Sequence, residues 1–165
     1  MTRTLILTRH AKSSWDTPVL DDHARPLNDR GTRSAKALGD WMRAKGWLPD
    51  QVISSSSTRT RETFAGLGLD TKAAFTDALY HASHTQMLRV LSQASGKSVL
   101  MLVHNPGAAA FAEALATSPP DYPRFYDYPT GATLVLHFEI DSWDQVQWHS
   151  GTVADFIVPR DLLPQ

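Results

Sequence analysis

The sequence predicts one three-layer α/β domain, in which a mostly parallel sheet lies between helices. Short β-branched or apolar runs alternate with segments whose apolar residues recur at helical spacing, an order typical of strand–helix–strand units. The length of 165 residues suits one domain, and a hydrophobic content of 42% is enough to fill one core. The last third of the chain alternates apolar and polar residues, which favours antiparallel strands at an edge of the sheet. We therefore expect a single domain over residues 1–165.

The expected strands and helices follow one another along the chain. Strands are predicted at 4–8, 52–54, 73–75 and 98–103, and helices at 29–45, 58–67, 85–93 and 105–116. Asn28 is a suitable N-cap for the first helix, and Gly46 is a suitable stop. Asn105 is expected to cap the last helix, with Pro106 at its first helical position.

The remaining segments have a different composition. Residues 13–27 are rich in Asp and Pro, and residues 117–130 are rich in Pro and Tyr, so both are predicted loops. A loop as long as 117–130, close to a site, is often functional. Residues 132–140 and 145–153 alternate like antiparallel strands, and 141–144 would be the turn between them.

The composition excludes several classes of protein and site. Sixteen Lys and Arg residues against seventeen Asp and Glu give a net charge of −1, whereas nucleic-acid-binding proteins are usually strongly basic. Without cysteine the chain has no disulfide, no thiolate metal ligand and no cysteine nucleophile. The apolar run at 5–7 is too short for a signal peptide, and the run at 99–103 is too short for a membrane span. We expect a soluble, cytoplasmic protein without a nucleic-acid or membrane partner.

Four basic side chains follow three of the predicted strands. Arg9 and His10 come directly after the first strand. Arg59 lies in the first turn of the helix after the second strand, and His104 follows the strand at 98–103. The carboxyl ends of parallel strands meet at one rim, where ligand crevices form and helix N-termini favour anions. We therefore expect these four side chains to share one site.

Arginine and histidine together suit a phosphoryl group. Guanidinium forks bind phosphate oxygens bidentately and stay charged at physiological pH. Histidine can attack phosphorus through one ring nitrogen or donate a proton, because it titrates near neutrality. Taken singly, each residue is equally compatible with a solvated rim or a helix entry. The interpretation as a phosphoryl-transfer site therefore depends on their common position.

The motifs around these residues resemble the histidine phosphatase superfamily, or phosphoglycerate mutase-like proteins, and more narrowly its SixA-type phosphohistidine phosphatases. The opening stretch LILTRHAKSSW is similar to that group's N-terminus, in which Arg-His-Ala-Lys replaces Arg-His-Gly. The segment ARPLNDRGTRSAKALGDWM resembles its first long helix and the approach to it. SSSTRTRET carries the pattern Ser-x-x-x-Arg-x-x-x-Thr, and LVHNPG carries the second histidine motif. PTGA and VPRDLL also resemble SixA-type relatives, so the similarity spans nearly the whole chain in the right order.

The resemblance implies a phosphoglycerate mutase-like fold and a phosphatase that uses neither metal nor cofactor. His10 would be the nucleophile, and the phosphohistidine that it forms would be hydrolysed by water. Arg9, Arg59 and His104 would bind the phosphoryl oxygens, with His104 cationic in the working state.

One part of the superfamily pattern does not carry over. Many members have a Glu or Asp that protonates the leaving group, whereas the corresponding segment here, 77–83, reads DALYHAS. Asp21 and Asp22 in the first loop are weak candidates for this role, since acidic loop residues are more often turn residues. A phosphohistidine substrate has less need of an acid, because protonated imidazole is already a good leaving group.

The other histidines have simpler interpretations. Surface, rim, packing or edge positions are expected for four of them: His81, His84, His137 and His149. His23 lies in the loop that faces the site and is a weak candidate for substrate contact. Lys12 follows the expected nucleophile by two residues and would add positive potential there.

We predict a phosphatase that acts on phosphohistidine in a partner protein, because the chain lacks the long insertions that larger relatives place over small substrates. A small-molecule phosphomonoesterase, acting on a sugar or nucleotide phosphate in the same pocket, is one alternative and would need a general acid. A non-catalytic phosphoryl-binding module is the other alternative, and it would not need a nucleophile.

Overall fold

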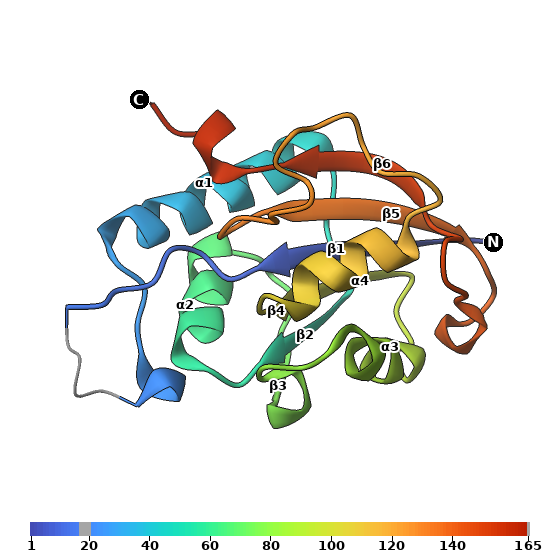
Figure 1. Ribbon diagram of the computed structural model, residues 1–165, viewed down its shortest axis with the longest axis horizontal. Coiled ribbons are helices and arrows are strands. Elements are labelled where there is room, and N and C mark those ends of the chain that lie inside the picture. The colour runs from blue at the N-terminus through green and yellow to red at the C-terminus, as the bar shows by residue number, and fades with distance from the viewer. Residues whose placement is uncertain (17–20, 165) are drawn as a thin grey trace.

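The computed structural model describes residues 1–16 and 21–164 and contains one six-stranded sheet between two layers of helices (Figure 1). The strand order is β3-β2-β4-β1-β5-β6. The first four strands pair in parallel, whereas β5 pairs antiparallel with β1 and β6 pairs antiparallel with β5. The strands are β1 (Thr2–Arg9), β2 (Gln51–Ser55), β3 (Ala73–Thr76), β4 (Ser98–Val103), β5 (Thr133–Glu139) and β6 (Thr152–Ile157). The helices are α1 (Asp29–Lys45), α2 (Thr58–Leu67), α3 (His84–Ser92) and α4 (Gly107–Leu115). The predicted three-layer α/β class is confirmed.

The side chains of β1 alternate between two cores, one on each face of the sheet. Leu5 and Leu7 belong to the core beneath α3 and α4, whereas Ile6 belongs to the core beneath α1 and α2. All three are fully buried, and each buried side chain of this size stabilises the fold by about 1.5–3 kcal/mol. This alternation holds the end of β1, where the predicted nucleophile lies, between two packed layers.

The helix termini follow the predicted capping residues closely. Asn28 Oδ1 accepts the backbone N–H of Gly31 at 2.8 Å, and Gly46 ends α1 in the left-handed conformation with φ of 77°. The last helix differs from the prediction, because Pro106 flanks α4 and is not its first residue. Asn105 still caps the helix from one position further out, since its Oδ1 accepts the N–H of Ala109 at 3.1 Å.

The predicted range of the second antiparallel strand is wrong. Residues 145–153 were expected to form it after a turn at 141–144, but β6 begins only at residue 152. The cause is Trp143, which is 1% exposed and packs on Phe138 with ring centroids 5.9 Å apart. A side chain buried in this way turns the connection into an anchored, irregular segment, with a short 3₁₀ helix, in place of a tight hairpin.

Both predicted loops are present in the described residues. The segment 117–130 has no helix or strand of its own, and it is fixed by Phe125 and Tyr128, which are buried in the core. The segment 13–27 contains one short 3₁₀ helix, and its residues 17–20 lie outside the described part. Among the described residues no helix is long and apolar enough to cross a membrane.

Candidate active site

The strands β1, β2 and β4 end at one rim of the sheet, and a pocket of about 230 Å³ lies there. Its lining includes all four basic side chains singled out in the sequence: Arg9, His10, Arg59 and His104. The rings of His10 and His104 are 5.2 Å apart between centroids. His10, Arg59 and His104 are at most 5% exposed. We call this hollow the catalytic pocket.

His10 is held as a neutral ring with one free lone pair. Its Nδ1 lies 2.7 Å from the carbonyl oxygen of Ala11, and because a carbonyl only accepts, Nδ1 carries the proton. The lone pair is therefore on Nε2. Burial lowers the pKa of His10 to about 3, with further contributions from the charges of Arg9, Arg59 and Arg25. The ring is thus unprotonated at Nε2 near neutral pH, as a nucleophile must be.

Ser55, Arg59 and Thr63 recur at intervals of four residues, and each has a separate contact in the site. Thr63 Oγ1 donates to the carbonyl of Arg59 at 2.7 Å and accepts the N–H of Ala11 at 3.0 Å. Ser55 Oγ lies 2.8 Å from Nε2 of His104. The motif therefore links helix α2 to the residue after His10 on one side and to His104 on the other.

Arg9 is positioned by the 117–130 loop. Its Nη1 donates to the carbonyl oxygen of Tyr128 at 3.2 Å, and Asn105 Nδ2 donates to the same oxygen at 3.0 Å. The hydroxyl of Tyr128 donates to the carbonyl of Leu7 and accepts the N–H of Leu134, so this loop is fastened to β1 and β5. Burial, followed by the charge of Arg59, lowers the pKa of Arg9, although a guanidinium remains charged at physiological pH.

His104 has one ring nitrogen bonded and one free. Its Nδ1 is buried and has no hydrogen-bond partner among the described residues, whereas Nε2 contacts Ser55. Burial lowers the pKa of His104 to about 2, and the neighbouring Arg59 guanidinium acts in the same direction, since a second cation beside it is unfavourable. The expected cationic form of His104 therefore depends on the negative charge of a phosphoryl group, which would raise this pKa.

Asp22 is an acceptor within the catalytic pocket. Its Oδ2 accepts from Tyr80 Oη at 2.5 Å, from His81 Nε2 at 3.0 Å and from Arg59 Nη2 at 3.1 Å. Burial alone would raise its pKa, but the hydrogen bonds from Tyr80, His81 and Arg59 lower it far below the usual value. A carboxylate that stays ionised cannot protonate a leaving group at neutral pH. Asp21 is exposed and does not line the pocket, so neither weak candidate is placed as a general acid.

His81 lines the pocket, although the sequence favoured only a surface or rim position for it. It lies at the rim, as expected, and stacks on His104 with ring centroids 5.4 Å apart. Its place in segment 77–83, where the superfamily has its acid, was the available signal. Arg25, from the segment that begins ARPLN, also lines the pocket, as does Lys12.

The other histidines lie outside the pocket lining. His23 Nε2 is 2.9 Å from Ser56 Oγ, so it supports the loop after β2. His84 packs against Trp148, and His137 packs against Trp47. His149 lies in the connection before β6, where its backbone has a φ of 57°.

The chain is similar to known proteins in sequence and in fold. Residues 5–80 match the family model described as the histidine phosphatase superfamily, branch 1. An uncharacterised protein of Mycobacterium tuberculosis is 33% identical over 159 residues, which cover 92% of this chain and 99% of that protein.

Two solved structures are similar over nearly the whole length. One is assigned as the phosphohistidine phosphatase SixA of Nakamurella multipartitia; it has a TM-score of 0.83, is 26% identical, and the match covers 96% of this chain and 97% of that one. The other, with the same assignment, is from Agrobacterium tumefaciens; it has a TM-score of 0.77, is 25% identical, and the match covers 95% and 98% of the two chains.

Proposed function

The chain belongs to the histidine phosphatase superfamily, and from this premise we propose that it hydrolyses phosphoryl groups through a covalent phosphohistidine on His10. The observation that carries the proposal is the state of His10. The ring is neutral, its Nδ1 proton is fixed by the Ala11 carbonyl, and its Nε2 lone pair is available beside two guanidiniums. A module that only bound phosphate would not need this arrangement.

The proposed reaction has two steps. Nε2 of His10 attacks phosphorus, the bond from phosphorus to the leaving atom breaks, and the leaving atom keeps that electron pair and takes up a proton. Water then attacks the phosphoryl group on His10. The N–P bond breaks, inorganic phosphate leaves, and the lone pair returns to Nε2.

Arg9, Arg59 and His104 supply the positive charge that the transferred phosphoryl group requires. The two guanidiniums are held in place by the 117–130 loop and by helix α2, so little reorganisation is needed when charge develops on the phosphoryl oxygens. The buried, unbonded Nδ1 of His104 is a third donor once the ring gains a proton. These residues provide all the electrostatic stabilisation in our proposal, which uses no metal ion and no cofactor.

The substrate that we propose is a phosphohistidine side chain on a partner protein. Leaving-group protonation is undemanding for a phosphoramidate, which agrees with an Asp22 that is ionised. The similarity to structures assigned as SixA over at least 95% of the chain points in the same direction.

The test is phosphate release, measured side by side for the wild type and His10→Ala. The substrates are a protein that carries phosphohistidine and a simple phosphomonoester. We expect rapid, His10-dependent release from phosphohistidine and slow release from the ester. Unchanged release in His10→Ala would overturn the covalent mechanism, and faster release from the ester would overturn the substrate.

A small-molecule phosphomonoesterase is the second candidate, and one observation favours it. His81 lies at the mouth of the pocket beside His104, and its Nε2 is 3.0 Å from Asp22 Oδ2. An imidazole in this place can donate a proton to an alkoxide leaving group. If this function holds, His81→Gln will slow ester hydrolysis much more than phosphohistidine hydrolysis. Equal effects on both substrates would contradict it.

A further inference from the structure

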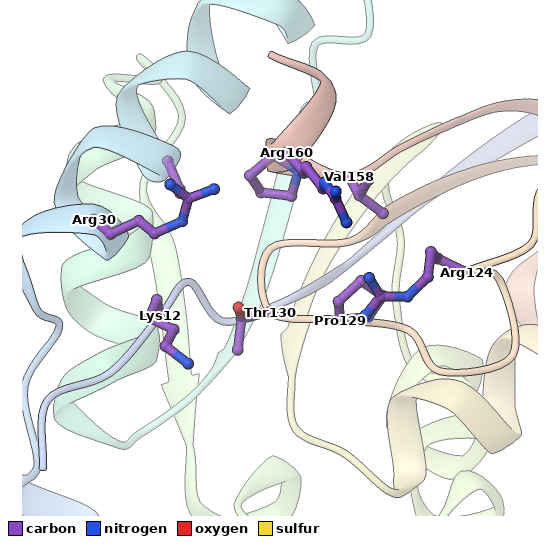
Figure 2. A pocket seen from close by; sticks show the side chains of 9 residues that line it. Lys12, Arg30, Arg124, Pro129, Thr130, Val158 and Arg160 are labelled. Carbon is purple, nitrogen blue, oxygen red and sulfur yellow. The ribbon is translucent and has the colours of Figure 1, made fainter. Parts of the chain in front are cut away.

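A second pocket, of about 210 Å³, lies next to the catalytic pocket and contains four cationic side chains. Lys12, Arg30, Arg124 and Arg160 line it, together with Thr130 (Figure 2). We call it the basic pocket. Among the residues that the structure describes, its lining includes no carboxylate.

The two pockets have a common wall, because Lys12 and Thr130 line both of them. Lys12 follows the proposed nucleophile by two residues, and Thr130 lies in the turn whose Gly131 N–H donates to the carbonyls of Arg9 and His10. A substrate that places a phosphoryl group against His10 therefore has the basic pocket immediately beside it.

The cations come from four separate parts of the chain. Lys12 follows β1, Arg30 lies in the first turn of α1, Arg124 belongs to the 117–130 loop, and Arg160 lies in the last 3₁₀ helix. Figure 2 shows Lys12 and Arg30 on one side, Arg124 and Arg160 on the other, and Thr130 between them. Like charges gathered around one hollow repel each other, and a cation at a helix N-terminus is unfavourable, so this arrangement does not serve stability.

Most of this charge is unpaired. Arg124 forms an ion pair with Asp127, with Nε and Oδ2 2.9 Å apart. Lys12, Arg30 and Arg160 form no ion pair with any residue in the described part of the chain. All four cations are solvent-exposed and can reorient toward a ligand.

Two close backbone approaches fix the walls of the basic pocket. A Cβ added at Gly31 would lie 2.0 Å from the carbonyl oxygen of Lys12, so the start of α1 packs directly on the segment after His10. A Cβ at Gly131 would lie 2.4 Å from the ring of Pro159, so the 129–131 turn packs on the residue before Arg160. Each contact lies next to a cation of the pocket, so close backbone packing fixes the positions from which these exposed side chains extend.

We propose that the basic pocket binds a second anionic group, a carboxylate or a phosphate, on the same substrate whose phosphoryl group enters the catalytic pocket. Guanidinium forks pair bidentately with both groups. The proposal rests on the proposed function, since it adds a recognition element to that reaction. The anion has two possible sources: acidic side chains near the phosphohistidine of a protein, or a further phosphate on a small molecule.

The test uses two matched pairs of substrates. One pair is a phosphohistidine peptide with Asp residues on both sides and the same peptide with Asn, and the other is a phosphomonoester with and without a second phosphate. The enzymes are the wild type, the double variant Arg30→Gln/Arg160→Gln, and Arg33→Gln as a matched control. Arg33 is an exposed arginine on α1 that does not line the basic pocket.

For the wild type we expect a KM about tenfold lower for the anionic member of one pair, with kcat unchanged. The double variant should lose this preference, and Arg33→Gln should keep it. The pair that shows the preference identifies the source of the anion. A wild type without preference in either pair, or a preference that survives in the double variant, would overturn the proposal.

A binding measurement separates this proposal from the proposed function. Fluorescence anisotropy of the unphosphorylated Asp peptide, against the Asn peptide, reports on the basic pocket without turnover. If the anion is a protein carboxylate, the wild type should bind the Asp peptide more tightly than the Asn peptide, and the double variant should bind both equally. Absence of His10-dependent turnover on all substrates would contradict the proposed function alone, whereas equal binding of both peptides by the wild type would contradict the basic pocket as a protein-binding subsite.

Discussion

The catalytic pocket and the basic pocket both contain arginine, but they hold it differently. The side chain of Arg59 is 3% exposed and donates twice to Asp22, once to the carboxylate and once to the backbone. Arg30 and Arg160 are exposed and unpaired among the described residues. A buried, fixed guanidinium can stabilise charge that develops in a transition state, because its orientation is set in advance. An exposed one adds attraction before the reaction and is screened by salt.

The largest effect expected from this comparison is on kcat. Arg59→Gln should lower kcat by about 10²- to 10³-fold, since it removes a positioned charge from the phosphoryl oxygens. Arg30→Gln should leave kcat within about twofold, because this side chain only adds attraction before the reaction. Steady-state kinetics on one phosphohistidine substrate, with melting temperatures as the control for folding, checks both. A comparable loss of kcat in both variants would contradict the claim that only the buried arginine stabilises the transition state.

A structural change at the boundary should disturb both pockets together. Gly31→Ala places a methyl group against the Lys12 carbonyl, and such overpacking costs about 1–3 kcal/mol of stability. Because Lys12 lines both pockets, we expect kcat to fall and KM to rise in the same variant.

Gly46→Ala is the matched control for that change. Its Cβ would meet no atom within 4 Å, while its φ of 77° still strains the backbone by about 1–2 kcal/mol. Activity per folded molecule should stay at the wild-type value. If Gly31→Ala is as active as Gly46→Ala under conditions where both are folded, the common wall has no functional effect.

The buried histidines should make the stability of the protein depend on pH, whereas the exposed arginines should not. The pKa values of His10 and His104 are lowered to about 3 and about 2, so the unfolded chain binds more protons than the folded one between pH 4 and 6.5. Stability therefore falls as the pH decreases through this range, on the order of 1 kcal/mol per pH unit for each histidine.

Urea unfolding of the wild type and of His10→Asn/His104→Asn over that range measures the difference. The double variant should have a clearly shallower dependence on pH, because asparagine does not titrate. Equal slopes would mean that the two rings are not held neutral in the folded state.

The smallest expected effect is that of a metal chelator. Guanidinium and imidazole groups supply the positive charge in our mechanism, so EDTA should leave kcat and KM unchanged after complete dialysis. A loss of activity that is restored by one divalent metal would contradict the metal-free mechanism.

The sequence predicts well what depends on local pattern. Residues 29–45 and 58–67 form helices with the expected bounds, because Asn28 and Gly46 cap the first and Ser57 and Gly68 cap the second. The convergence of the site at one rim follows once the strands are taken as parallel, because their carboxyl ends then meet at the same edge of the sheet.

Other features depend on contacts between segments that no local pattern records. Asp22, Tyr80 and His81 meet from two loops about 58 residues apart, and the hydrogen bonds formed there lower the pKa of Asp22. The late start of β6 depends on the burial of Trp143 against another strand. The basic pocket, likewise, is assembled from four segments whose charges look like ordinary surface residues in the sequence.

The most direct test of the account is to identify the covalent intermediate. The wild-type protein is mixed with a phosphohistidine peptide, quenched in alkali, where phosphohistidine survives, and analysed by tandem mass spectrometry and by phosphorus NMR. We expect one phosphoryl group on His10, attached at Nε2, because Nδ1 carries a proton that it donates to the Ala11 carbonyl. A phosphoryl group on another side chain or at Nδ1 of His10, or rapid turnover with no labelled protein at any time point, would contradict it.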